Sequence, residues 1–409
     1  MQPRKRTDGP ISVGDRTAAL EAELVATRRD LHRHPELGFE ETRTAGVVAG
    51  RLGDLGIEPR TGVAGTGVVG VVSSEPSPGE PRRTVLLRAD MDALPIQEEN
   101  DHEYRSTVPG RMHACGHDGH TAILLGVARL LVEDPPPGNV VLVFQPAEEK
   151  PGGARPMIEA GVLADPPVDA AIGLHLWSNL PVGTVGTNPG PLMAGASEFR
   201  LTIKGRGGHA ALPHQAVDAV VVASHVVVAL QTLVSRETSP LDSAVVTVGS
   251  IHGGTTFNVI AERAVLEGTV RAFEDDRREA PRDRIAALVQ GVAGAMGAEA
   301  TLEWTPHYPA TVNDPAMAAL VAREAAVVVG EENVFTDIRT MGAEDMSYFL
   351  RAVPGCFFFV GAANAARGIT APHHNPRFDI DEAALPIGAE ILARAARAFL
   401  AGGSSGLDG

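Results

Sequence analysis

The residues with the clearest chemical potential lie between Arg111 and Thr121, in the stretch Arg-Met-His-Ala-Cys-Gly-His-Asp-Gly-His-Thr. This stretch supplies one thiol, one carboxylate and three imidazoles. These are the side chains that bind first-row transition metals in proteins. A short cluster of this kind can also be a solvated loop, so a metal site needs further donors elsewhere in the chain. The cluster consists of His113, Cys115, His117, Asp118 and His120.

Further acids and histidines follow short apolar runs of the sequence. Strands that are apolar throughout and alternate with helices are typical of a parallel sheet, where sites gather at the carboxyl ends of the strands. A catalytic zinc ion takes three protein ligands and an open position, so this larger set indicates a pair of metals that share a bridge. The Cys115 thiolate could be that bridge. The candidate donors are Asp90, Asp92, Cys115, His117, Glu149, His175 and His374.

The pair Glu148-Glu149 follows the apolar run Val140 to Phe144. Two acids in a loop are most often solvated surface residues. At a junction between strand and loop, however, adjacent side chains point to different sides, so one carboxylate can bind a metal while the other transfers protons. The pair is therefore a candidate for both roles.

Local patterns predict the elements that carry these residues. Apolar positions at helical spacing predict helices at Thr17–Arg33, Glu41–Leu55, Thr121–Val132 and Ala154–Ala160. Apolar runs bounded by turn residues predict strands at Gly67–Val72, Thr84–Leu87, Val140–Phe144 and Ala170–Leu174. The predicted fold class is α/β, with a mostly parallel sheet flanked by helices.

A second domain is expected within the first. After a stretch rich in Gly, Pro and Thr, the pattern from Glu198 to Trp304 reads β-α-β-β-α-β, which is the ferredoxin-like order. We expect a catalytic metal-binding domain at 1–192 and 307–409, interrupted by an inserted α+β domain at 193–306. The α/β pattern resumes after the insertion.

Composition limits the possible classes of protein. The chain has 409 residues, of which 44% are hydrophobic and 21% charged, as in globular proteins. Its 35 basic and 51 acidic residues give a net charge of −16, which disfavours nucleic acid and anionic lipid as partners. The two cysteines are too few for a disulfide scaffold, and no signal peptide or long apolar span is read. These features predict a cytoplasmic protein without a membrane or nucleic-acid partner.

The motifs resemble those of the N-acyl-amino-acid amidohydrolases, the branch of the dinuclear metallopeptidases that contains hippurate hydrolases and indoleacetyl-amino-acid hydrolases. This resemblance extends over nearly the whole chain. It implies a catalytic α/β domain with an inserted lid and dimerisation domain. The matching segments are Leu31–Glu36, Leu87–Pro95, Met112–His120, Phe144–Glu149, Gly173–His175, Gly208–Ala210, Met341–Asp345 and His374–Pro376.

The same resemblance assigns residues to roles. It implies that Glu148 is the general base and that Asp92 orients a metal ligand. His374, rather than the adjacent His373, matches the ligand because it directly precedes the Asn-Pro step. Since Cys115 stands where related enzymes use a bridging carboxylate, the metal can be zinc, manganese, cobalt or nickel. The implied ligands of two divalent metal ions are Cys115, His117, Glu149, His175 and His374.

Three residues of the inserted domain receive expected roles. By resemblance, His209 reaches the scissile carbonyl from this domain, although a histidine after two glycines is also common in exposed turns. Asn258 and Arg271 are candidates for binding the free carboxylate of a substrate, since a guanidinium matches a planar anion. The resemblance and the apolar segment Ala219–Val234 also predict a homodimer.

Together these observations predict a metal-dependent amidohydrolase that cleaves N-acyl-L-amino acids with a metal-activated water and Glu148 as the base. Carboxypeptidase or dipeptidase activity on short peptides is an alternative. A thiol hydrolase with Cys115 as nucleophile is a second alternative, although it leaves His175, Glu149 and His374 without roles. A binding protein that has kept the fold is a third. The acyl group and the amino acid stay open.

Overall fold

The computed structural model describes residues 4–76, 79 and 81–402. The chain divides into two compact units. Unit 1 contains the chain up to Leu192, the segment Val312–Arg339 and the chain from Asp345 onward, whereas unit 2 contains Met193–Thr311 and Thr340–Glu344. The sequence predicts an insertion at 193–306 and does not anticipate its last segment. This segment belongs to unit 2 because Ala194 donates a backbone hydrogen bond to the carbonyl of Thr340, at 3.1 Å.

Unit 1 is built on one eight-stranded sheet with the strand order β1-β2-β4-β3-β5-β16-β6-β15. The four central strands, β4, β3, β5 and β16, are parallel, while β1–β2, β2–β4 and β16–β6 pair antiparallel. This confirms the expected mostly parallel sheet. The strands are β1 (Arg60–Val63), β2 (Gly67–Ser74), β3 (Thr84–Asp90), β4 (Gly138–Gln145), β5 (Ala170–Pro181), β6 (Val185–Gly186), β15 (Val334–Phe335) and β16 (Gly355–Ala363).

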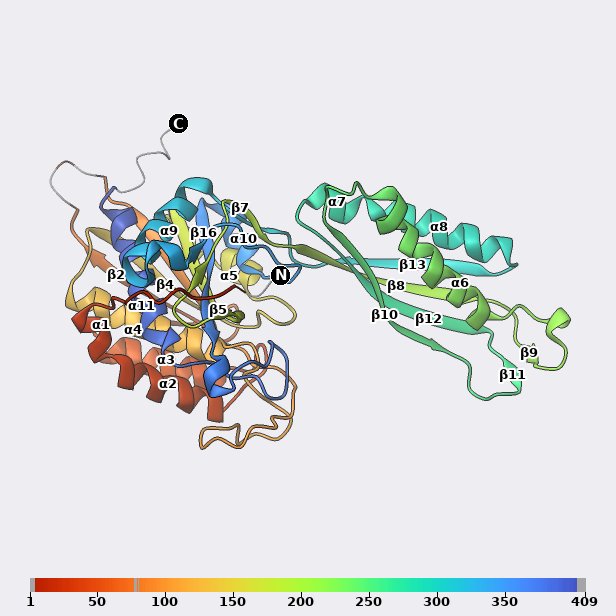
Figure 1. The fold of residues 1–409 in the computed structure, drawn as a ribbon, viewed down its shortest axis with the longest axis horizontal. Coiled ribbons are helices and arrows are strands. Elements are labelled where there is room, and N and C mark those ends of the chain that lie inside the picture. Colours follow the sequence, from red (N-terminus) through yellow and green to blue (C-terminus); the bar gives the residue numbers. More distant parts are fainter. Residues whose placement is uncertain (1–3, 77–78, 80, 403–409) are drawn as a thin grey trace. The chain divides into compact units, whose positions relative to one another are not determined.

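Helices flank both faces of this sheet (Figure 1). Leu174 of β5 faces α4 and α11, because Ile123, Leu174 and Gly388 meet there. The next position back, Gly173, faces Met346 of α10 on the other side of the sheet. Such burial on both faces explains why the central strands are apolar throughout. The helices are α1 (Asp15–Ala19), α2 (Glu21–Arg33), α3 (Thr42–Asp54), α4 (His117–Glu133), α5 (Ala154–Glu159), α9 (Pro315–Val329), α10 (Met346–Ala352) and α11 (Ala384–Leu400).

Two expected boundaries are wrong. The first predicted helix is two helices, because Leu20 separates α1 from α2. The helix expected from Thr121 begins four positions earlier, at His117, directly after Gly116 with a φ of 95°. Only glycine adopts this left-handed conformation without strain. Asp118 in the first turn suits the positive end of the helix dipole, so His117, Asp118 and His120 start the helix instead of preceding it.

Unit 2 contains a four-stranded antiparallel sheet with the order β10-β12-β8-β13. Its elements follow the chain order β8, α6, β10, β12, α8, β13, which is the β-α-β-β-α-β order that the sequence predicts. Shorter elements are the paired strands β9 (Gly208–His209) and β11 (Val259–Ile260) and the helix α7 (Asp275–Glu279). The paired strands β7 (Gly190–Met193) and β14 (Thr311–Asn313) belong mostly to unit 1. The main elements of unit 2 are β8 (Gly195–Lys204), α6 (Ala219–Thr232), β10 (Ala244–Gly253), β12 (Arg263–Ala272), α8 (Pro281–Ala295) and β13 (Glu299–Pro306).

Helix α6 has two apolar faces. Val222, Val226 and Leu230 pack into the core of unit 2, whereas Val221 and Val228 are exposed. With the π-helical turn that follows, the helix covers Ala219–Glu237, and its 19 residues are long and apolar enough to cross a membrane by length and composition alone. No long apolar span is expected from the sequence, so that expectation is wrong for this segment. Because one face packs against the sheet of unit 2, α6 serves as a layer of this domain.

Candidate metal centre

The predicted ligands lie at the carboxyl ends of neighbouring parallel strands in unit 1. Cys115 and His117 lie at the start of α4, which follows β3 along the chain. Glu149 follows β4, and His175 lies within β5. His374 lies in the loop between β16 and α11. Since β4, β3, β5 and β16 are adjacent in the sheet, residues from four parts of the sequence meet at one edge.

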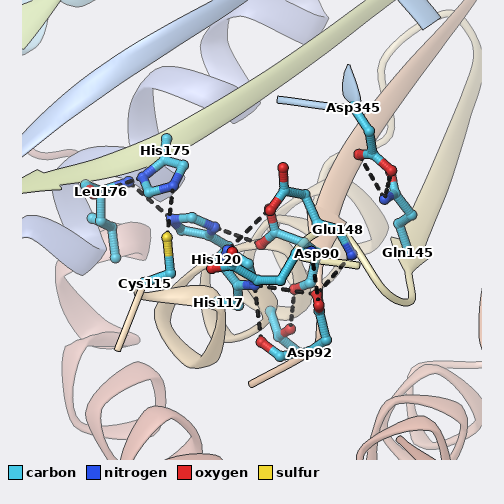
Figure 2. Close-up of polar contacts among 12 residues, drawn as sticks. Asp90, Asp92, Cys115, His117, His120, Gln145, Glu148, His175, Leu176 and Asp345 are labelled. Atoms are coloured by element: carbon cyan, nitrogen blue, oxygen red, sulfur yellow. Dashed lines mark hydrogen bonds and ion pairs between the residues drawn. The ribbon is translucent and has the colours of Figure 1, made fainter. Parts of the chain in front are cut away.

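The first group of donors consists of Cys115, His117 and His175 (Figure 2). The Cys115 Sγ lies 3.5 Å from the Nε2 of His175. His175 donates from Nδ1 to the carbonyl of Leu176 at 2.7 Å, so its Nε2 lone pair faces the thiol. His117 donates from Nδ1 to the carbonyl of Asp92 at 2.9 Å, which leaves its Nε2 for a ligand. Backbone carbonyls thus fix the tautomers of both rings, as in many metal sites.

A second group consists of Cys115, Glu149 and His374. The Nε2 of His374 lies 3.0 Å from the Oε1 of Glu149. Within each group, the ligand atoms lie within 4.8 Å of one another. Because Cys115 belongs to both groups, its sulfur lies between two sets of donors.

The chemistry of these donors fits a pair of divalent transition-metal ions. The buried Nε2 of His117 has no hydrogen-bond partner within residues 4–76, 79 and 81–402, and the buried Oε1 of Glu149 has only its ion-pair contact with the Nε2 of His374. Leaving a buried polar atom unpaired costs about 1–3 kcal/mol, and a metal ion would supply the missing partner. Thiolate, imidazole and carboxylate together suit zinc and its first-row neighbours.

Electrostatics at this centre also favour a bound cation. Burial, together with Glu149, Glu148 and Asp90, raises the pKa of the Cys115 thiol well above its usual value. Burial alone would lower the pKa of His117, but Asp90 and Asp92 outweigh this effect and raise it to about 10. The carboxylate contributions to both shifts reflect negative charge near the two side chains. A divalent cation would balance this charge and stabilise the thiolate.

Asp92 links several parts of the centre. Its Oδ1 accepts a hydrogen bond from the backbone N–H of Glu148 and its Oδ2 accepts one from Glu149, both at 2.9 Å. The same carboxylate lies 3.3 Å from the Nδ1 of His117. One buried acid therefore positions two ligands and the candidate base together.

The expectation that Glu148 and Glu149 point to different sides is wrong. Oxygen atoms of both carboxylates lie within 4.8 Å of each other and of the His117 Nε2. The alternation of a strand does not apply here because β4 ends at Gln145 and Ala147 has a positive φ of 54°. Ala147 is held in this conformation by its backbone N–H, which donates to the Oε1 of Glu41 at 2.8 Å. The turn brings the two carboxylates to one side.

Residues without an assigned role in the sequence analysis support the ligands. Asp90, a candidate donor, accepts from His120 Nδ1 at 2.6 Å and from Arg88 Nη1 at 2.7 Å. The Nε2 of His120 in turn accepts the backbone N–H of Leu176 at 2.9 Å, next to His175. His373 uses both ring nitrogens, one with Ser178 and one with the Leu176 carbonyl. Both oxygens of Asp90 and both nitrogens of His120 and His373 are thus occupied by protein partners.

The three candidate residues of unit 2 are not brought together. His209 and Asn258 lie near each other, because Val259 of β11 pairs with His209 of β9. Arg271 is the penultimate residue of β12, which begins only five positions after Asn258. At about 3.3 Å per residue, Arg271 lies roughly 25 Å from the start of β12, the end near Asn258. Within unit 2, one small carboxylate cannot contact both Asn258 and Arg271.

Comparison with known proteins decides the family. A sequence profile described as peptidase family M20/M25/M40 matches residues 86–398. The chain belongs to this family. It is 44% identical over 383 residues to the IAA-amino acid hydrolase ILR1-like 4 of Arabidopsis thaliana, covering 92% of this chain and 86% of the relative. It is 41% identical over 398 residues to the N-acetyl-L-cysteine deacetylase of Bacillus subtilis, covering 97% and 92%.

A solved structure agrees with this assignment. The crystal structure of the Bacillus subtilis YXEP protein, described as a dinuclear metal binding peptidase from the M20 family, superposes with a TM-score of 0.79 at 35% identity, covering 94% of this chain and 99% of that one. The M20 chain is thus a hydrolase of amide bonds, and it acts with metal on N-acyl amino acids. The expected family, activity and fold are confirmed.

The position of Asp92 generates a prediction. In Asp92→Asn, one acceptor oxygen becomes an amide that cannot accept the backbone N–H facing it. We expect the affinity for zinc to fall by about 10- to 100-fold, because groups that orient metal ligands contribute that much. Competition with a chromophoric chelator measures this affinity. The exposed Asp54→Asn, at the end of α3, is the matched control. Equal zinc affinity in both variants would show that Asp92 has no part in metal binding.

Proposed function

We propose that Cys115, His117, Glu149, His175 and His374 hold two divalent metal ions, with Cys115 shared between them, and that Glu148 is the base for hydrolysis of N-acyl-L-amino acids. The single observation that carries this proposal is the membership of Cys115 in two donor groups. Bound there, the metals would supply Lewis acidity, which polarises a carbonyl and acidifies water. Zinc, manganese, cobalt and nickel all fit the donor set.

Glu148 is suited to proton transfer. Its side chain is buried, and its backbone N–H is fixed by Asp92. We propose that its carboxylate takes a proton from the attacking water as the C–O bond forms. It then delivers this proton to the amide nitrogen as the C–N bond breaks, which releases the acid and the free amine. The Glu148 carboxylate is then deprotonated again, as it was before the reaction.

His209 is the candidate donor to the developing oxyanion. Its Nδ1 accepts a hydrogen bond from the backbone N–H of Ala211 at 3.1 Å. A neutral His209 therefore carries its proton on Nε2, which can donate it in a hydrogen bond. We propose that this N–H stabilises the negative oxygen of the tetrahedral intermediate.

Asn258 and Arg271 stay candidates for binding the substrate carboxylate. Arg271 is half-buried and donates from Nη1 to the carbonyl of Met341 at 2.8 Å. This bond uses one of five guanidinium donors and orients the rest. Asn258 lies beside His209 through the β9–β11 pairing. Because Asn258 precedes β12 and Arg271 lies at its far end, they are proposed as separate contacts.

A thiol hydrolase is the weaker alternative. The buried Cys115 thiol has its pKa raised by burial and by Glu149, Glu148 and Asp90, so the free thiolate that such a mechanism needs is disfavoured. Carboxypeptidase or dipeptidase activity would use the same chemistry, on a substrate whose acyl group is an aminoacyl or peptidyl group.

A panel of substrates tests the proposed function. We expect N-acetyl, N-benzoyl and N-indoleacetyl amino acids to be hydrolysed faster than dipeptides, because the site has a base and metal donors but the proposal includes no group for a free amino terminus. Release of the amino acid is measured with each of the four metals, and after chelation. Faster cleavage of dipeptides would establish the peptidase alternative, and full turnover in a metal-free sample would refute metal dependence.

Glu148→Gln tests the base. The amide keeps the size of the side chain but cannot take a proton, so turnover should fall by roughly 10²- to 10⁴-fold. Metal content, measured by elemental analysis, should be unchanged. Loss of metal instead would mean that the roles of Glu148 and Glu149 are exchanged.

His209→Ala tests the oxyanion donor. Turnover should fall by about 10²- to 10³-fold, as is typical when one such donor is removed, while metal content and unfolding temperature stay constant. His214→Ala, a change of another exposed histidine of unit 2, is the control. If both variants turn over substrate at the same rate, His209 is an ordinary surface residue.

We also propose a homodimer formed through unit 2. The outer face of α6 exposes Val220, Val221 and Val228, and β10 and β13 are the edge strands of the sheet. Exposed apolar faces and open strand edges are common in interfaces between identical chains. Light scattering after gel filtration measures the mass, and Val228→Asp should shift it toward a monomer.

The cytoplasmic location stays a prediction.

A further inference from the structure

A second group of metal-binding side chains lies in unit 1, apart from the Cys115 centre. It consists of His32 on α2 together with Glu98 and His102, which both lie in the connection between β3 and α4. The Oε1 of Glu98 lies 3.3 Å from the Nε2 of His32 and 3.2 Å from the Nε2 of His102. All three ligand atoms lie within 4.8 Å of one another. None of these residues belongs to the two groups that share Cys115.

We propose that His32, Glu98 and His102 form a separate site for a divalent transition-metal ion of the zinc type. Bonds of about 2.0–2.1 Å to a tetrahedral ion would separate neighbouring ligand atoms by about 3.3 Å. The two nitrogen-to-oxygen distances already match this spacing. Two imidazoles and a carboxylate are a common protein set for such ions.

His32 is oriented as a metal-binding histidine. Its Nδ1 lies 2.8 Å from the Oδ2 of Asp118. Since the ionised carboxylate only accepts, Nδ1 donates the proton, and Nε2 faces Glu98 with either a proton or a metal ion. Asp118 is itself fixed by the Nε of Arg28 at 2.9 Å. A carboxylate that holds the far nitrogen of the ring is the usual support of a histidine ligand.

His102 is held in place without using its ring nitrogens. The ring stacks on Tyr104 with centroids 3.8 Å apart and planes 16° apart. Neither nitrogen is hydrogen-bonded to any residue that the structure describes, although Nε2 lies so close to Glu98. The side chain is 19% exposed, but both ring nitrogens are buried. An oriented imidazole with an unused lone pair is what a metal ligand requires.

The charges around this group are negative in sum. Glu98 belongs to the group, Asp118 contacts His32, and the nearby carboxylates of Asp118, Asp379 and Glu382 pair with Arg28 and Arg29. Two negative charges therefore stay uncompensated if both imidazoles are neutral. A divalent cation would neutralise them.

The site would fix a long loop. Between β3 and α4 the chain runs from Met91 to Gly116 without a helix or a paired strand longer than an isolated bridge. Loops of this length are unusual in compact domains unless they have a function or are held by other interactions. A metal between α2 and this loop would stabilise the segment that ends at Cys115. The free energy of metal binding would then stabilise the folded state of the chain.

Elemental analysis of zinc tests the site. The full chain, without an affinity tag, is equilibrated with zinc and desalted, and His102→Ala is compared with wild type. We expect His102→Ala to bind about one zinc ion fewer per chain, because three ligands are the minimum for such a site. His34→Ala changes a histidine that directly follows α2 and lies outside the group, so it should bind the wild-type amount. Equal zinc in His102→Ala and wild type would overturn the proposal.

To distinguish this site from the Cys115 centre, zinc content with and without His102→Ala is compared again in a chain that carries Cys115→Ser. The same difference of one ion should persist there, whatever the number of ions at the Cys115 centre. Loss of the difference in this background would assign the ion to the Cys115 centre and overturn the proposal.

Limited trypsin digestion gives a second measurement that uses the wild-type chain. Arg105 is exposed in the loop. Zinc should slow cleavage after Arg105 by about tenfold or more, because bound metal stabilises by mass action the conformation in which the loop is held against α2. In His102→Ala this protection should be absent. Protection that persists in the variant, or a rate that zinc does not change in wild type, would contradict the site.

Discussion

Two hydrogen bonds from consecutive backbone N–H groups to the Asp92 carboxylate hold the functional turn after β4. Because Asp92 also lies beside the Nδ1 of His117, it couples the turn to the start of α4. Burying this carboxylate is unfavourable unless its oxygens are paired, so the turn and the helix are both needed for a stable site. The candidate base and two candidate metal ligands therefore depend on one acid for their relative positions.

The sheet provides the frame for this interaction. Asp92 follows β3, the turn follows β4 and His175 lies in β5, and these three strands are adjacent and parallel. Buried ion pairs also hold the ends of these strands. Arg88 of β3 pairs with Asp90 at 2.7 Å and with Asp345 at 2.8 Å, while Gln145 at the end of β4 donates to Asp345. Removing one partner of a buried pair of this kind costs about 3–5 kcal/mol, which makes the strand ends rigid.

Much of the fold followed from the sequence because its signals are local. Continuous apolar runs identify the central strands, and Pro and Gly mark the ends of most helices. The predicted ligands meet because adjacent parallel strands end at the same edge. Thr340–Glu344 could not be assigned to unit 2 from the sequence, since its position depends on an isolated bridge to Met193 and on hydrogen bonds from Ala194 and Arg271.

The finer features of the site depend on contacts that the sequence does not encode locally. The direction of Glu148 and Glu149 depends on the positive φ of Ala147 and on Glu41, which is more than a hundred residues away. The role of His120 depends on Asp90 and on the backbone of Leu176. The cluster of His32, Glu98 and His102 joins a helix to a loop with no spacing motif. Only the assembled chain brings these groups together.

Anomalous diffraction from a metal-loaded crystal tests the shared thiolate most directly. Data collected at the absorption edge of the bound metal should give two peaks, one on each side of the Cys115 Sγ and each roughly 2.3 Å from it. One peak would have His117 and His175 as its other neighbours, and the second would have Glu149 and His374. A single peak at this centre, or two peaks with the sulfur outside bonding distance of either, would contradict a dinuclear site bridged by Cys115.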